Sequence, residues 1–199
     1  MNTNLTRRGT VAAGVGTLLI PLALMLGTPA QADVRAEPVG PACASLPQEG
    51  EGSAEGMVDD PVATAASNNP ELSTLTAAIE QAGLADTLND AENITVFAPT
   101  DEAFEKVPQA DLDALLADKD QLTEVLTYHV VGEEVAPGDL ADGTFETLQG
   151  DDLTTDEVDG AYIVNDSAKV VCGDLETENA TVHLVDTVLL PPESTSSPS

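Results

Sequence analysis

Residues 94–104 read Ile-Thr-Val-Phe-Ala-Pro-Thr-Asp-Glu-Ala-Phe, and this stretch decides the fold. Its β-branched and aromatic residues at 95–97 favour a strand. Pro99 has no amide hydrogen and keeps the residue before it extended, so we expect the strand to end there. Thr100 or Asp101 suits a helix N-cap, and the acidic pair that begins at Asp101 favours the positive end of a helix. The stretch therefore predicts a strand, a sharp turn and a helix in direct succession.

Outward from this joint, helical patterns come first along the chain and strand patterns come later. Apolar residues recur every three or four positions, as in amphipathic helices, at residues 62–66, 72–79, 84–88, 112–116 and 122–126. Residues 128–131, Tyr-His-Val-Val, are expected to form a strand. From Thr144 to Leu190 short β-rich runs alternate with turns, of which Asp159-Gly160 suits a two-residue hairpin. Helices before strands predict the α+β class in one domain, not a parallel α/β sheet.

The N-terminal segment has the pattern of an export signal. Arginines at positions 7 and 8 precede an apolar run from Val11 to Leu26, and Ala30-Gln31-Ala32 suits cleavage by signal peptidase. A membrane anchor is the alternative, but the apolar run has 16 residues, includes Pro21, and falls short of the roughly 20 that a spanning helix needs. We therefore predict a signal peptide at residues 1–32 and a mature chain without a membrane span. The choice between the general and the twin-arginine export route stays open.

Charge is the second strong feature of the sequence. All 36 acidic residues lie after Ala32, whereas only four of the six basic residues do, which gives the mature chain a net charge of −32. A chain this acidic will not bind nucleic acid or an anionic membrane by electrostatic attraction. The acidic residues are spread over every segment, which fits either a salt-loving source or a secreted protein of high solubility. In both cases we expect salt to stabilise the fold, because salt screens carboxylate repulsion.

The two cysteines, Cys43 and Cys172, are predicted to form a disulfide, because an even cysteine count in an exported chain favours pairing over free thiols. This bridge would fasten residues 33–57 to a late strand. That segment is rich in Glu, Gly, Pro and Ser, and we expect it to be an extended acidic lead-in. The folded domain is then predicted over residues 58–192, followed by a disordered polar tail at 193–199.

Catalytic and metal-binding patterns are weak in this sequence. His129 stands in an apolar run and is expected to be buried and hydrogen-bonded, whereas His183 alternates with apolar neighbours and is expected to face solvent. No nucleophile motif accompanies either histidine. The acidic clusters lack the spacing of a calcium-binding EF-hand loop, and two histidines with two distant cysteines do not suit zinc. We therefore predict no catalytic residue, no metal site and no cofactor.

Three segments together resemble the conserved blocks of fasciclin domains. They are residues 94–104, the Tyr-His segment at 126–131 and the closing segment at 181–191. The resemblance covers about residues 58–192. Within the family, the chain looks most similar to the single-domain immunogenic antigens that mycobacteria secrete, although it is much more acidic. The resemblance implies a fasciclin-like α+β fold, in which N-terminal helices pack on a mostly antiparallel β-sandwich or wedge.

The same resemblance implies a non-enzymatic role in adhesion or ligand binding. In animal fasciclin domains, positions that match Tyr128, His129 and Asp186 have been linked to integrin recognition, so these three are the candidate adhesion contacts. The expected partner is an extracellular-matrix or cell-surface protein or glycan, and the protein is expected to be a monomer, secreted or associated with the cell envelope. Two alternatives stay open: an extracellular hydrolase that uses His129 with a nearby carboxylate, and a purely structural envelope protein.

Overall fold

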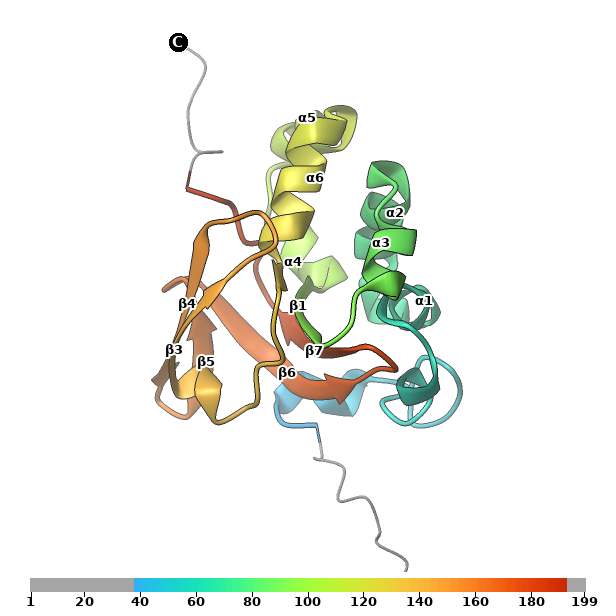
Figure 1. Cartoon of the computed structure of the whole chain (residues 1–199), viewed down its shortest axis with the longest axis vertical. Coiled ribbons are helices and arrows are strands. Elements are labelled where there is room, and N and C mark those ends of the chain that lie inside the picture. The colour runs from blue at the N-terminus through green and yellow to red at the C-terminus, as the bar shows by residue number, and fades with distance from the viewer. Residues whose placement is uncertain (1–37, 193–199) are drawn as a thin grey trace, which may run out of the picture. The chain divides into compact units, whose positions relative to one another are not determined.

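The computed structural model describes residues 38–192, which form helices and one sheet of seven strands (Figure 1). The predicted signal peptide at 1–32, the beginning of the lead-in and the predicted tail at 193–199 lie outside the described residues. Within the described part, no helix combines the length and the apolar character that crossing a membrane requires. The helices come mainly before residue 129 and most strands after it, so the predicted α+β class is confirmed.

Six α-helices and four short 3-10 helices are found in the described part of the chain. The α-helices are α1 (Val62–Asn68), α2 (Ser73–Ala82), α3 (Ala85–Asp90), α4 (Asp101–Glu105), α5 (Gln109–Ala117) and α6 (Lys119–Tyr128). The 3-10 helices are η1 (Pro41–Ser45), η2 (Met57–Asp59), η3 (Pro70–Leu72) and η4 (Asp139–Ala141). All five predicted helical patterns therefore correspond to helices.

The strands form a sheet that closes on itself. They are β1 (Ile94–Pro99), β2 (Val130–Val131), β3 (Asp142–Glu146), β4 (Asp152–Val158), β5 (Ala161–Val164), β6 (Ala168–Glu176) and β7 (Ala180–Val185). Their order in the sheet is β2-β1-β7-β6-β5-β4-β3, and every neighbouring pair is antiparallel except β1 and β7. The two ends of this order meet, because Val131 pairs with Thr147 and the amide of Leu148 donates to the carbonyl of Val130 at 2.7 Å. The mostly antiparallel, barrel-like sheet confirms the expectation.

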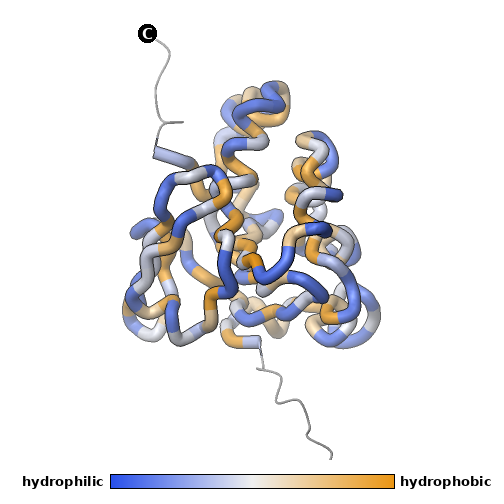
Figure 2. Tube along the Cα trace, viewed as in Figure 1, coloured by the Kyte–Doolittle hydropathy of each residue, from blue (hydrophilic) through white to orange (hydrophobic). Residues whose placement is uncertain are grey.

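Two apolar cores lie on opposite faces of β1 and β7. Alternate residues of β1, such as Val96 and Ala98, share the first core with α1, α2 and α6. Phe97 points the other way and shares the second core with Phe145, Leu153 and other residues of β3 to β6. Figure 2 shows apolar and hydrophilic residues alternating along the helices, with hydrophilic residues gathered at the turns. Because β1 and β7 separate the two cores, all six residues of each strand are buried.

The joint at residues 94–104 folds as predicted. Thr100 is the N-cap of α4, and its hydroxyl oxygen accepts a hydrogen bond from the amide of Ala103 at 3.4 Å. Asp101 turns instead to the start of α2, where it accepts hydrogen bonds from the Ser73 hydroxyl and from the Thr74 amide, the latter at 2.8 Å. Partial burial raises the pKa of Asp101, but these hydrogen bonds outweigh it and hold that pKa below its usual value. One turn therefore caps two helices.

Two further local predictions had opposite outcomes. The hairpin at Asp159-Gly160 forms, with φ angles of 53° and 77° as a type I′ turn requires, and Val158 pairs with Ala161 across it. The strand predicted at residues 128–131 is wrong in its first half. Tyr128 ends α6 and His129 is its C-cap, so the strand is confined to β2. The helix continues because Leu122, Val125 and Tyr128 recur at helical spacing and bury one face.

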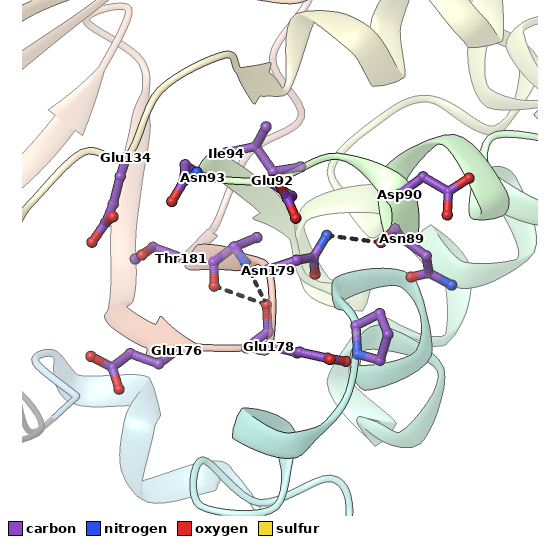
Figure 3. Close-up of a pocket in the computed structure, with 13 residues that line it drawn as sticks. Asn89, Asp90, Glu92, Asn93, Ile94, Glu134, Glu176, Glu178, Asn179 and Thr181 are labelled. Carbon is purple, nitrogen blue, oxygen red and sulfur yellow. Dashed lines mark hydrogen bonds between the residues drawn. The ribbon is translucent and has the colours of Figure 1, made fainter.

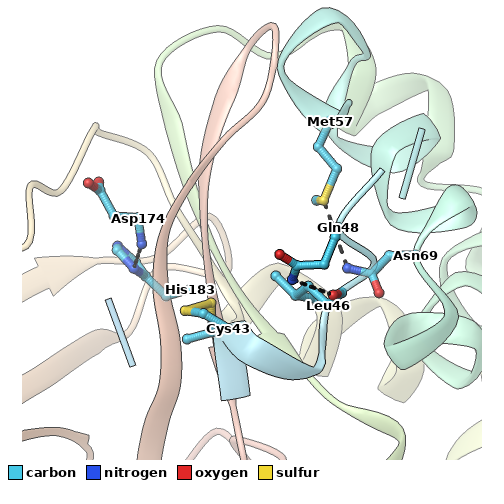
Figure 4. Close-up of a disulfide and its surroundings, with 8 residues drawn as sticks. Cys43, Leu46, Gln48, Met57, Asn69, Asp174 and His183 are labelled. Carbon is cyan, nitrogen blue, oxygen red and sulfur yellow. Dashed lines mark hydrogen bonds between the residues drawn. A yellow bond between two sulfur atoms is a disulfide. The ribbon is translucent and has the colours of Figure 1, made fainter. Parts of the chain in front are cut away.

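The described part of the lead-in packs on the domain rather than running freely extended to residue 57. Val39 pairs with Gly173 of β6, and η1 then places Cys43 beside Cys172, with which it forms the predicted disulfide (Figure 4). A side chain at Gly40 would lie 2.3 Å from the carbonyl oxygen of Val171, so only glycine fits this close approach. Leu46 and Met57 are buried, and their apolar burial explains why this polar segment folds.

Candidate functional site

Tyr128, the first candidate contact, is a buried anchor between α6 and the hairpin strands. Its ring is 2% exposed and lies in the second core. The phenol donates to the carbonyl of Asp152 at 3.2 Å and accepts from the side-chain amide of Asn165 at 2.7 Å. Burial raises the pKa of Tyr128, so the phenol stays neutral and keeps its donor role. Tyr128 therefore connects the end of α6 to β4 and to the turn after β5.

His129 is buried and hydrogen-bonded, as the sequence predicted. It is 2% exposed, and its Nδ1 lies 2.7 Å from the carbonyl oxygen of Val125. Its Nε2 accepts a hydrogen bond from the amide of Leu189 at 3.0 Å. Nε2 must be an acceptor there, so Nδ1 carries the hydrogen and donates to Val125. Both ring nitrogens are thus used to hold the closing segment against the end of α6.

His183, by contrast, does not face solvent, and that prediction was wrong. Its side chain is 0% exposed, and its ring lies 5.4 Å from the ring of Phe97 in the second core. The amide of Asp174 donates to Nδ1 at 3.1 Å, which leaves Nε2–H to donate toward the carbonyl of Val135 at 3.4 Å. The alternation along β7 was recognised correctly, but both faces of this strand are covered. The two histidines therefore adopt opposite tautomers, each fixed by backbone partners.

Asp186, the third candidate, lies at the surface. Its side chain is 30% exposed and pairs with Lys106 at 2.9 Å. It also accepts hydrogen bonds from the amide of Lys169 at 2.9 Å and from the Thr187 hydroxyl at 3.0 Å. Partial burial raises the pKa of Asp186, but the bonds from Lys169, Lys106 and Thr187 outweigh it and lower that pKa below its usual value. The carboxylate is therefore ionised and held in one orientation.

These positions change how the three candidates can act. A partner cannot touch the rings of Tyr128 or His129 without opening the second core or the end of α6, since both rings are buried. We therefore no longer expect Tyr128 and His129 to touch a partner directly, and regard them as residues that position backbone segments. For Asp186 the expectation of direct contact is retained. Leu190 follows the segment held by His129 and is 49% exposed, a surface feature that the sequence analysis did not single out.

A groove lined with carboxylates runs along one end of β1 and β7. It measures about 740 Å³, and Figure 3 shows the acidic side chains around it. They come from the end of α3, the loop before β1, the loop after β2, and the β6–β7 turn, and are Asp90, Glu92, Glu134, Glu176 and Glu178. None of the residues lining the groove is basic. These acids come from three segments that are far apart in the sequence, 90–92, 134 and 176–178, so no single sequence cluster indicated the groove.

Asn179 organises this end of the domain, although no local sequence pattern indicates that role. Its side-chain oxygen accepts from the amide of Val62 at 2.8 Å, which caps α1 where Pro61 supplies no side-chain bond. Its side-chain amide donates to the carbonyl oxygens of Leu88 at 2.7 Å and Ala91 at 2.6 Å. One side chain in the β6–β7 turn therefore holds the start of α1 and the end of α3.

Within residues 38–192, no group of three or more histidine, cysteine or acidic side chains is arranged to hold a metal ion. The carboxylates of the groove are therefore a diffuse negative surface and not a coordination shell.

Comparison with known proteins places this geometry in a family. The sequence profile of the fasciclin domain matches residues 70–191. The chain is 49% identical over 173 residues to the cell surface glycolipoprotein MPB83 of Mycobacterium bovis, an alignment that covers 83% of this chain and 77% of the relative. It is 45% identical over 182 residues to the immunogenic protein MPB70 of the same species, covering 87% of this chain and 91% of the relative.

A solved structure shares the fold at low sequence similarity. It contains a pair of FAS1 domains from the insect cell adhesion molecule fasciclin I. The superposition has a TM-score of 0.56 at 20% sequence identity, and it covers 69% of this chain and 53% of the solved one. The match thus spans about half of the solved chain, which holds two domains. At this identity the likeness concerns the fold alone.

Proposed function

The chain belongs to the fasciclin family, and from that premise we propose that it is a secreted or cell-surface module that binds a partner without catalysing a reaction. The observation that carries the proposal is the state of the two histidines. Both are buried, and each ring nitrogen has a backbone partner. Neither histidine has a carboxylate or hydroxyl partner of the kind that a hydrolytic site uses. This arrangement favours binding over the alternative of a hydrolase that uses His129.

The names of the relatives support an extracellular place of action. MPB83 is described as a cell surface glycolipoprotein, and the insect protein with the shared fold is a cell adhesion molecule. The predicted signal peptide agrees with the same location. We infer that the protein acts outside the cell, either released or associated with the envelope.

Charge limits the kind of partner. With 36 acidic residues in the chain, complementary patches on a partner will be basic, and attraction will speed association at low salt. A matrix or cell-surface protein with a basic patch, or a glycan that carries amino groups, satisfies this requirement. Nucleic acid and anionic lipid do not, because both repel carboxylates.

The proposed contact surface lies around Asp186 and the closing segment. Asp186 is ionised and fixed by Lys106 and Lys169, and Leu190 is exposed a few residues further on. His129 acts beneath this surface as a positioning residue, because it holds the amide of Leu189, whereas Tyr128 holds β4 at the carbonyl of Asp152. Interfaces have an apolar centre and a polar rim, so a partner would bury Leu190 and meet Asp186 at the edge of the contact.

The test is a binding screen with mature protein, residues 33–199, against immobilised matrix proteins and cell-wall glycans, read by biolayer interferometry. For any partner found, Asp186→Asn and Leu190→Ser should each weaken binding at least several-fold. Asp156→Asn, an exposed acid of β4 on another part of the sheet, is the matched control and should change little. If all three variants bind equally well, the contact surface lies on another part of the domain.

A second measurement addresses catalysis directly. Mature protein would be assayed with chromogenic ester, amide and glycoside substrates, beside the variant His129→Gln. Turnover that disappears in His129→Gln while the melting temperature is unchanged would overturn the proposal in favour of a hydrolase.

A further inference from the structure

Residues 187–190, which follow β7, are fastened to the domain by a single backbone hydrogen bond. The amide of Leu189 donates to Nε2 of His129 at 3.0 Å. In the part of the chain that the structure describes, no other backbone hydrogen bond holds residues 187–190. Apolar burial adds to this attachment, because Val188 lies in the first core and Leu189 in the second. The imidazole of His129 is therefore the polar attachment point of this segment.

Asp186, directly before this segment, is held much more firmly. Its amide donates to the carbonyl of Lys169 at 3.0 Å, and its carboxylate accepts from the amide of Lys169 and pairs with Lys106. β7 ends at the residue before it. Release of residues 187–190 would therefore leave the sheet and the bonds of Asp186 in place.

A proton on the ring of His129 is incompatible with the attachment. Nδ1 already carries a hydrogen and donates to the carbonyl of Val125 at 2.7 Å, so an added proton has to bind at Nε2. The new N–H group would then face the amide N–H of Leu189, and both groups would lose their acceptor. The residue is 2% exposed, so water cannot replace that acceptor while residues 187–190 stay bound. Proton binding at Nε2 therefore requires the segment to leave.

No charged side chain offsets this effect. The ring of His129 hydrogen-bonds only to Val125 of α6 and to Leu189, and its backbone carbonyl accepts from the amide of Phe97 in β1. The strands β1 and β2 and residues 187–190 carry no titratable side chain. The titratable groups on the other neighbouring elements make no hydrogen bond to the ring; they are Asp101, Glu102 and Glu105 on α4, Lys119, Asp120, Glu124 and Tyr128 on α6, and Asp186 after β7. Burial lowers the pKa of His129 to about 4, and no charged group is among the causes.

We propose that His129 is a pH switch: binding of a proton to Nε2 releases residues 187–190 from the end of α6 while the sheet stays folded. Release displaces Leu190, the apolar part of the proposed contact surface, so acid should weaken the binding of a partner. The switch itself stands on the geometry of His129 and Leu189. Only its effect on binding rests on the proposed function.

The size of the effect follows from the two states of the ring. In the released state the ring meets water and regains its ordinary pKa of about 6.5, whereas the bound state takes up a proton only near pH 4. The attachment is therefore at full strength above pH 6.5 and weakens as the pH falls. Between pH 7.5 and pH 5.0 the equilibrium constant for release should rise about thirtyfold.

The test is amide hydrogen exchange of mature protein, residues 33–199, read by NMR at pH 7.5 and pH 5.0 with the salt concentration held constant. The protection factor of the Leu189 amide, which is the ratio of its intrinsic to its observed exchange rate, should fall about thirtyfold in the wild type. In His129→Gln, which keeps a side-chain acceptor but cannot take up the proton, this factor should change less than about threefold. His183→Asn removes the other buried histidine and is the matched control, so it should keep the full fall at Leu189.

Two measurements on the wild type decide the proposal even if His129→Gln fails to fold. Amides within β7 should stay more strongly protected than the Leu189 amide at both pH values, because release leaves the sheet intact. In an NMR titration toward pH 4, the amide shift of Leu190 should change with the same midpoint as the ring signals of His129.

Four results would overturn the proposal. They are an unchanged Leu189 protection factor between pH 7.5 and 5.0, a fall that survives in folded His129→Gln, equal protection of Leu189 and the β7 amides at pH 5.0, and different midpoints for Leu190 and His129. Any partner found in the binding screen should dissociate faster from the wild type at pH 5.0 than at pH 7.5, and equally fast from His129→Gln. If exchange behaves as expected while no partner is found, the switch is supported and the proposed function fails.

Discussion

The two buried histidines should make this domain sensitive to mild acid. Burial, partly opposed by the hydrogen bond to Val125, lowers the pKa of His129 from 6.5 to about 4. Burial, partly opposed by the bond to Val135, lowers that of His183 to about 4 as well. In the unfolded chain both rings regain the ordinary pKa. The unfolded state therefore binds protons first, so these groups contribute full stability above pH 6.5 and lose it as the pH falls toward 4.

The size of the effect follows from the shift. Each pKa unit corresponds to about 1.4 kcal/mol, so each ring accounts for roughly 3 kcal/mol once the pH lies below both values. At pH 5 about 2 kcal/mol of this is already lost for each ring. The free energy of unfolding should therefore fall by about 4 kcal/mol between pH 7.5 and pH 5. Two effects oppose the loss: the raised pKa of Asp174, and relief of carboxylate repulsion, which comes mostly nearer pH 4.

The assay is urea unfolding followed by circular dichroism at pH 7.5, 6.5, 5.5 and 5.0, with enough NaCl to screen surface charge. His129→Gln and His183→Asn should each be less stable than the wild type at pH 7.5, because packing and hydrogen bonds are lost. Each should also lose about half of the pH dependence. Asp156→Asn, an exposed acid, should keep all of it. A free energy of unfolding that stays constant from pH 7.5 to 5.0, or a slope that survives in the double histidine variant, would refute the reasoning.

Three further predictions concern stability. Replacing Cys43 and Cys172 by serine should lower the free energy of unfolding by on the order of 4–5 kcal/mol in the chain-entropy model, measured by urea titration; two free thiols in native wild type would contradict the bridge. Between 0.1 and 1 M NaCl, where the Debye length shrinks from about 10 to about 3 Å, the melting temperature should rise; a flat or falling response would remove the electrostatic argument. Asn179→Ala should lower the free energy of unfolding, measured by thermal unfolding, by about 2 kcal/mol, because it leaves the Val62 amide and two carbonyls without partners. Asn179→Asp keeps only the acceptor and should retain part of this stability. Equal stability of the wild type and both variants would show that solvent replaces these bonds.

Local signals predicted local structure well. The strand–helix joint at residues 94–104 was predictable because proline, the N-cap and the apolar pattern all act within a few residues. The hairpin at Asp159-Gly160 was predictable for the same reason. At Tyr128 two local signals competed. The β-prone residues that follow it favoured a strand, but burial of the helical face formed by Leu122 and Val125 prevailed.

Features that depend on distant partners could not be predicted in this way. The burial of His183 follows from the central place of β7 between two cores, which alternation along one strand does not reveal. The hydrogen-bond partners of Asn179 lie between 88 and 117 positions before it in the sequence. Its sequence neighbours therefore did not indicate that it holds two helices. The three candidate contacts came from the resemblance to fasciclin domains, and only the structure shows that Tyr128 and His129 are buried.

The parallel pair of β1 and β7 has a consequence for the order in which the molecule can be completed. β7 is the last strand among residues 38–192, yet it lies between β1 and β6 and forms part of the wall of both cores. A growing chain that ends before residue 180 contains the helices and the hairpins. It lacks β7, the strand that joins them. Each half then exposes apolar surface that will later be covered by one short segment. The fold is therefore completed only when β7, near the C-terminal end, inserts between β1 and β6. A chain cut before Ala180 should remain incompletely folded, sensitive to proteases and prone to aggregate.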